Sequence, residues 1–151
     1  MEAPVQVEEL ISPRQIRRKP VDPVKAERTA EAARNLKMKT EIFDFPVFKT
    51  GEPMPLKYYI HADILGSIIS RRQSAGEVVT PEIKEEIKAA IQRQLKKYCR
   101  ADEYRMAAVI RQKRYKLNGE EAEKISDKDM HGFIALVRAA ERRKSENGEK
   151  P

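Results

Sequence analysis

The sequence predicts a mainly α protein: a small helical bundle of three to five helices built on an antiparallel helical hairpin, with an extended Pro- and Phe-rich segment and an N-terminal arm. Two observations carry this prediction. Apolar residues recur every three or four positions in several segments, which is the period of an amphipathic helix. Thr, Ser, Asp and Pro stand where those segments begin, and Gly follows where several of them end, as expected for helix caps.

The composition limits the size of the core. Of the 151 residues, 36% are charged and 6% are aromatic, so we expect only about half to two-thirds of the chain to form a compact core. The predicted parts are an arm over 1–21 that is disordered or ordered by a partner, a helix plus an extended segment over 22–57, a helical core over 58–144, and a disordered tail over 145–151.

The segment after the arm changes character near residue 41. Asp22 and Pro23 start a predicted helix over roughly 23–39. Three prolines then exclude a continuous helix over 41–59, which we expect to be extended. Its large apolar side chains either line the core or insert into a partner subunit, and we take four of them as candidate partner-binding residues: Phe43, Phe45, Val47 and Phe48.

The next three predicted helices form the core. A helix from about 58 to 72 carries a stripe that includes Ile60, Ile64 and Ile68, and Gly76 follows its end. The hairpin over 80–119 should pack against this stripe. Its first helix begins at a Thr80 cap, and its second is expected to continue to Leu117 and to end at Asn118-Gly119.

The last predicted helix covers roughly 127–144. Ser126 and Asp129 resemble a capping box at its start. Its apolar face includes Phe133 and Val137, and basic residues crowd its end, where cations suit the negative end of the helix dipole.

The second helix of the hairpin carries a recognisable pattern: Asp102, Tyr104, the pair Ala107-Ala108, Ile110 and Arg111. Together with the preceding Leu95-Lys96-Lys97, this pattern resembles the UVR motif over about residues 88–117. The UVR family comprises short helical hairpins of excision-repair proteins and some protease adaptors. The resemblance implies a protein–protein contact module that recruits a repair or proteolysis partner. Gln112 departs from the family pattern, which usually has an acidic residue at this position.

The charge is concentrated in one stretch. Residues 91–117 contain nine basic and two acidic residues, 9 − 2 = +7, which equals the net charge of the whole chain. This surface suits nucleic acid, an acidic protein or anionic lipid, and a plainly solvated helix face is the alternative. The candidate nucleic-acid-binding residues are Arg93, Lys97, Arg111, Lys113, Arg114 and Lys116. Reversing the charge of Arg111 and Arg114 is expected to abolish binding without unfolding the protein.

The sequence gives no pattern for catalysis or metal binding. Cys99 has no neighbour at metal-ligand spacing, and His61 reads as a surface or interface residue. No glycine-rich phosphate loop or nucleophile motif is present. We therefore expect no catalytic residues, no metal, no cofactor and no enzymatic activity. No segment is apolar enough to span a membrane, and no signal peptide is visible, so the protein is expected in the cytoplasm.

These observations favour a non-enzymatic structural or adaptor protein. It would dock onto the protein subunits of a larger assembly, for example a nucleoprotein, through its extended arm and helical hairpin. The alternative is a nucleic-acid-binding protein that contacts DNA or RNA phosphates with the basic face of 91–117. The sequence does not identify the partner or the oligomeric state.

Overall fold

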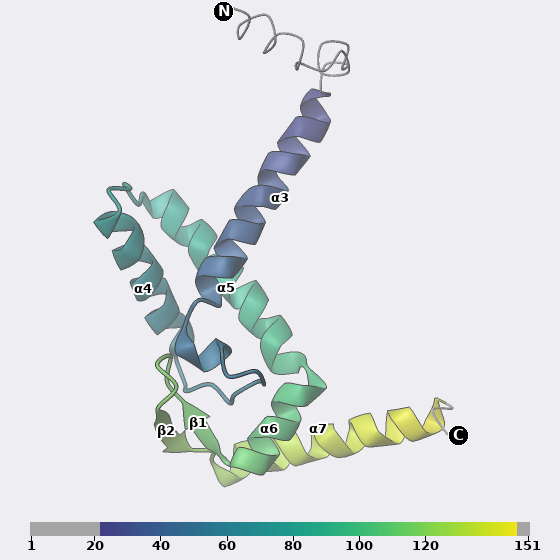
Figure 1. Ribbon diagram of the computed structural model, residues 1–151. Coiled ribbons are helices and arrows are strands. Elements are labelled where there is room, and N and C mark those ends of the chain that lie inside the picture. Colours follow the sequence, from purple (N-terminus) through teal and green to yellow (C-terminus); the bar gives the residue numbers. More distant parts are fainter. Residues whose placement is uncertain (1–21, 148–151) are drawn as a thin grey trace, which may run out of the picture. The chain divides into compact units, whose positions relative to one another are not determined.

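The computed structural model describes residues 22–147 (Figure 1). The predicted arm over 1–21 and the last four residues of the predicted tail lie outside the described residues. The chain divides into two compact units at Arg34. In the first unit, α3 (Pro23–Ile42) begins, with Asp22 Oδ1 accepting a hydrogen bond from the backbone N–H of Val24 at 3.1 Å. The side chains of 22–34 are exposed.

The second unit contains the end of α3 and all the remaining elements. These are the 3-10 turn η1 (Pro46–Phe48) and the helices α4 (Ile60–Ser74), α5 (Pro81–Arg100), α6 (Asp102–Arg111) and α7 (Asp127–Glu146). Two short strands, β1 (Lys113–Tyr115) and β2 (Glu121–Lys124), stand between α6 and α7. The mainly α class and the small helical bundle are confirmed. None of the described helices is both long enough and apolar enough to cross a membrane.

Helix starts agree closely with the cap residues of the sequence. Thr80 Oγ1 accepts from the N–H of Ile83 at 3.2 Å, and Pro81 occupies the first position of α5. Ser126 Oγ accepts from the N–H of Asp129 at 3.2 Å and so caps α7. Each cap satisfies a backbone donor that the helix itself leaves free.

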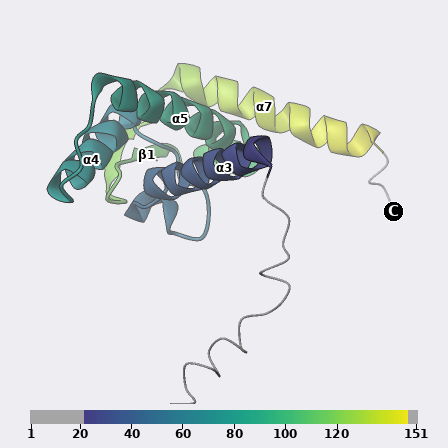
Figure 2. The same ribbon diagram turned by 90° about the horizontal axis from the view of Figure 1, so that it is seen from above.

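The core of the second unit lies where α4 and α5 pack side by side (Figures 1 and 2). Ile64, Ile68 and Ile87 are completely buried, and Ile91 is 1% exposed. The expected apolar stripes therefore do face one another. The connection between α5 and α6 is the single residue Ala101, and α6 packs mainly on α7 and to a lesser degree on α5.

The prediction that the second helix of the hairpin continues to Leu117 is wrong for its last part. Helix α6 ends at Arg111, because Gln112 takes a left-handed backbone (φ 63°), and a β-hairpin follows. Strand β1 pairs antiparallel with β2, with Tyr115 opposite Glu121. Gly119, with a φ of 88°, lies in the turn of this hairpin. The Asn118-Gly119 pair was predicted to end a helix, but it connects two strands.

A strap formed by residues 53–57 runs beside β1. The N–H of Tyr115 donates to Pro55 O at 2.8 Å, and the N–H of Lys57 donates to Tyr115 O at 3.0 Å. Leu56 and Tyr115 form an isolated parallel bridge. The extended segment expected around Pro53 and Pro55 is thus fixed by hydrogen bonds to β1 of the hairpin.

Candidate nucleic-acid interface

One basic surface lies along α5. Arg93, Lys96, Lys97 and Arg100 are spaced by three or four residues, so they share one side of the helix, opposite the buried Ile87 and Ile91. We call these four residues the α5 basic face. All four are exposed. Within residues 22–147, no carboxylate lies within 4 Å of any of them. These cations are therefore available to an anionic partner.

Two further candidate cations, the half-buried Arg111 and the exposed Lys113, are paired with carboxylates. The Arg111 guanidinium contacts the Glu52 carboxylate and lies 5.7 Å from the centroid of the Tyr115 ring. Lys113 Nζ lies 3.0 Å from both carboxylate oxygens of Glu121. That hydrogen bond raises the pKa of the Lys113 ammonium. Lys116 is exposed near the tip of the hairpin.

Arg114 has a different environment, because its side chain is buried at 7% exposure. Nη1 donates to Leu56 O at 3.0 Å, and Nη2 donates to Asp129 Oδ2 at 3.0 Å. Nη2 also donates to Tyr58 Oη at 3.2 Å, and the guanidinium carbon lies 4.1 Å from the centroid of that ring. Arg114 therefore ties the strap to the start of α7. Among the described residues, nothing accepts a hydrogen bond from its buried Nε.

The burial and bonding of Arg114 argue against the expectation that its charge can be reversed without unfolding the protein. A carboxylate at this position would lie beside Asp129 with its other neighbours unpaired, which is costly in a buried site.

Tyr98 and Tyr104 hold the strap rather than offering free rings. Tyr104 Oη accepts from the N–H of Leu56 at 3.0 Å, and Tyr98 Oη accepts from the N–H of Met54 at 2.9 Å. Burial raises the pKa of both phenols above its ordinary value. Both hydroxyls accept hydrogen bonds from backbone donors that no strand partner reaches.

The four candidate partner-binding residues pack within the protein itself. Val47 is completely buried and Phe45 is 5% exposed. The Phe43 and Phe48 rings meet edge-to-face with centroids 5.0 Å apart, and Phe48 meets Tyr98 at 5.2 Å. The structure therefore places this segment in the core, which was the first of its two expected locations.

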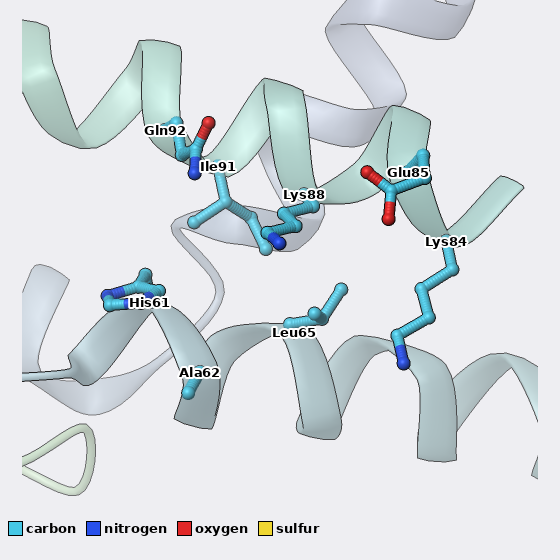
Figure 3. Close-up of a pocket in the computed structure, with 8 residues that line it drawn as sticks. All are labelled: His61, Ala62, Leu65, Lys84, Glu85, Lys88, Ile91 and Gln92. Carbon is cyan, nitrogen blue, oxygen red and sulfur yellow. The ribbon is translucent and has the colours of Figure 1, made fainter. Parts of the chain in front are cut away.

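A groove between α4 and α5 adds residues that the sequence pattern did not single out (Figure 3). Its volume is about 300 Å³. His61, Ala62 and Leu65 form the α4 wall, and the α5 wall contains Lys84, Glu85, Lys88, Ile91 and Gln92. We call it the α4–α5 groove. The spacing of Lys84, Lys88 and Gln92, four residues apart, was the available signal for a shared face. No group of three or more potential metal ligands occurs in the described part of the chain.

Comparisons with known proteins identify a family whose members resemble this chain. The family model described as ProQ/FINO matches residues 33–150, which include the whole segment 88–117. The resemblance to the UVR motif is therefore wrong. The Asp-x-Tyr-x-x-Ala-Ala pattern belongs to α6, which packs mainly on α7 and is followed by a β-hairpin.

A solved structure from Neisseria meningitidis MC58, described as a FinO-like RNA chaperone, has a similar fold. Its TM-score is 0.52 at 18% sequence identity, and the match covers 81% of this chain and 98% of that chain. No curated protein sequence matches the chain. The match of the family model over most of the sequence, together with this shared fold, shows that the chain belongs to the ProQ/FinO family.

Proposed function

We propose that this protein binds RNA and acts as an RNA chaperone, with the α5 basic face contacting RNA phosphates. The observation that carries the proposal is the family match, joined to the exposed cations of the α5 basic face, which have no carboxylate neighbours among the described residues. The similar Neisseria structure is itself described as an RNA chaperone, which supports RNA over the DNA alternative. A chaperone role also agrees with the expectation that the protein is not an enzyme.

The adaptor interpretation has less support than this RNA-binding alternative. It relied on a Phe-rich segment that inserts into a partner, and Phe45 and Val47 are buried in the protein's own core. It also relied on the UVR resemblance, which the family match removes.

Phosphate contacts fit the geometry of the α5 basic face. Arg93 and Arg100 are seven positions apart, which is about 10 Å along the helix at 1.5 Å per residue, and Lys97 lies between them. Long basic side chains on one helical face can reach several phosphates without reading base sequence. We therefore expect strong salt dependence and weak sequence preference.

The test is a binding titration with a fluorescent structured RNA, and with DNA of the same sequence, at several salt concentrations. The Arg93→Glu/Lys97→Glu variant should weaken RNA binding by more than tenfold because two phosphate contacts become repulsive. The Lys124→Glu/Lys128→Glu variant makes the same change in net charge outside this face and should bind more nearly like wild type. Equal losses in both variants would show that only net charge matters.

Chaperone activity needs its own measurement. The protein should accelerate annealing of two complementary, individually folded RNAs, and the Arg93→Glu/Lys97→Glu variant should lose this acceleration. Tight RNA binding without any acceleration would leave an RNA-binding protein and remove the chaperone role.

A further inference from the structure

The outer side of α6 carries apolar side chains that the rest of the protein leaves uncovered. Tyr104 and Ala108 are buried on the inner side of this helix. Met106 and Ile110, by contrast, are 39% and 69% exposed. They stand four positions apart, so they lie next to each other on one side of the helix.

Met106 and Ile110 belong to the wall of a second groove, which shares no residue with the α4–α5 groove. Its volume is about 480 Å³. The strap contributes Pro53, the loop before the strap contributes Glu52, and Lys144 comes from α7, which packs against α6 (Figure 1). We call it the α6 groove. Single exposed apolar side chains are ordinary on a protein surface, but apolar side chains gathered along a groove indicate a docking site.

The lining of the α6 groove has the opposite charge to the chain as a whole. It contains three carboxylates and one cation, 1 − 3 = −2, whereas the whole chain carries +7. The carboxylates belong to Glu52, Asp102 and Glu103. An arginine of the same chain neighbours each of the first two. Within residues 22–147, no cationic nitrogen lies within 4 Å of the Glu103 carboxylate, so this group is available to a cationic partner.

The sign of this charge determines the class of ligand. An acidic lining disfavours the phosphates of RNA and of anionic lipids. A cationic protein segment with apolar side chains complements both the carboxylates and the apolar wall. Amphipathic helices dock into grooves in this way, with apolar residues three or four positions apart as anchors. The flexible thioether of Met106 can adapt its shape to such anchors.

We propose that the α6 groove docks a basic amphipathic helix of another protein. Apolar side chains of that helix enter the groove against Met106 and Ile110, and a Lys or Arg beside them pairs with Glu103. The volume lies within the range of about 300–1,000 Å³ that is usual for ligand pockets. This inference goes beyond the proposed RNA binding, because it assigns a protein partner to a surface other than the α5 basic face.

The test is a fluorescence titration of the whole protein with synthetic peptides. The first peptide has about 15 residues, Leu and Lys only, ordered so that its leucines share one side of a helix. The second has glutamate in place of every lysine, and the third has the residues of the first in an order that scatters the leucines. Wild type should bind the first peptide more tightly than either of the others, and rising salt should weaken this binding.

The apolar contact is tested by removing one anchor. Ile110→Ser should weaken binding of the first peptide about fivefold or more, because an apolar side chain in the middle of the contact is lost. Val78→Ser is the matched control, because Val78 is 80% exposed and lies outside the groove. It should bind like wild type. Both replaced side chains are exposed, so the unfolding temperatures of the two variants should stay close to that of wild type.

The electrostatic contact is tested by a change of specificity. Glu103→Lys should lose affinity for the lysine peptide and gain affinity for the glutamate peptide, a gain that no loss of folding could produce. Glu82→Lys is the matched control, since Glu82 and Glu103 each occupy the second position of a helix. It should keep the wild-type preference.

Several results would overturn the inference. It fails if wild type binds the three peptides equally, if Ile110→Ser binds the first peptide like wild type, or if Val78→Ser loses as much affinity. Self-association of the protein in analytical ultracentrifugation that Ile110→Ser abolishes would assign the groove to a second copy of this chain instead. Ile110→Ser should bind RNA like wild type, so failure of the docking proposal and failure of the proposed RNA binding are separate results.

Discussion

Arg114 and Arg93 come from the same basic stretch of sequence, but the structure gives them opposite surroundings. Arg114 is buried and bonded to Leu56 O and Asp129, whereas Arg93 lies exposed on α5 with no described carboxylate beside it. The same side chain is a structural tie in one place and a free cation in the other. Net charge within a segment therefore does not indicate which of its cations are available to a partner.

The largest difference in stability is expected between two single variants that carry the same substitution, one at each of the two arginines. Arg114→Met should lower the free energy of unfolding by about 3 kcal/mol, because Leu56 O loses its partner in a buried site and the half-buried Asp129 loses its ion pair. Arg93→Met should change it by less than about 0.5 kcal/mol. Chemical denaturation of both variants measures the difference. Similar values for the two variants would contradict the contrast between them.

A double-mutant cycle sharpens the same comparison. Arg114→Met, Asp129→Asn and the combined variant should give a coupling energy of about 1 kcal/mol or more, because the two side chains share one ion pair. Additive effects would mean that Arg114 stabilises the protein mainly through Leu56 and Tyr58.

Tyrosines offer a second pair of buried and exposed groups. Tyr104→Phe should cost about 2 kcal/mol, because the N–H of Leu56 would lose its acceptor in the core. Tyr59→Phe should leave the stability unchanged, because that ring is exposed. Thermal unfolding of the two variants checks this. A neutral Tyr104→Phe would show that water reaches the strap.

Replacing each of two glycines by alanine is expected to change the stability of the protein in opposite directions. Gly119→Ala should destabilise by about 1 kcal/mol, because the hairpin turn requires a positive φ. Gly66→Ala, inside α4 and with open space around the added methyl group, should stabilise by about 0.5–1 kcal/mol. The denaturant midpoints of both variants measure these changes in stability. A loss of stability in Gly66→Ala would contradict the conclusion that the added methyl group has room.

The smallest effect on stability should accompany a clear effect on binding. Arg93→Gln/Lys97→Gln should leave unfolding unchanged and lower the slope of log affinity against log salt by about 2, one for each phosphate contact. Arg114→Met should leave this slope as in wild type. If Arg114→Met lowers the slope while the protein is still folded, the buried arginine itself contacts phosphate.

Helix caps and apolar stripes were predictable from the sequence because they depend on local spacing. Thr80, Ser126 and the isoleucines of α4 and α5 act as their positions indicate. The β-hairpin was missed because the Asn118-Gly119 pair suits either a helix end or a strand turn, and β1 depends on contact with a strap some 60 residues earlier. Nothing local could reveal that Arg114 points inward to Leu56.

The strap also has a consequence for the order in which the chain folds. The backbone N–H groups of Met54, Leu56 and Lys57 bond to Tyr98, Tyr104 and Tyr115, each at least 44 positions later. At about 5–20 residues per second, a ribosome needs roughly 3–12 s to add the 58 residues between Lys57 and Tyr115. During synthesis the strap therefore cannot form these hydrogen bonds until its partner residues have been made. The second unit can complete its folding only when most of the chain has been synthesised.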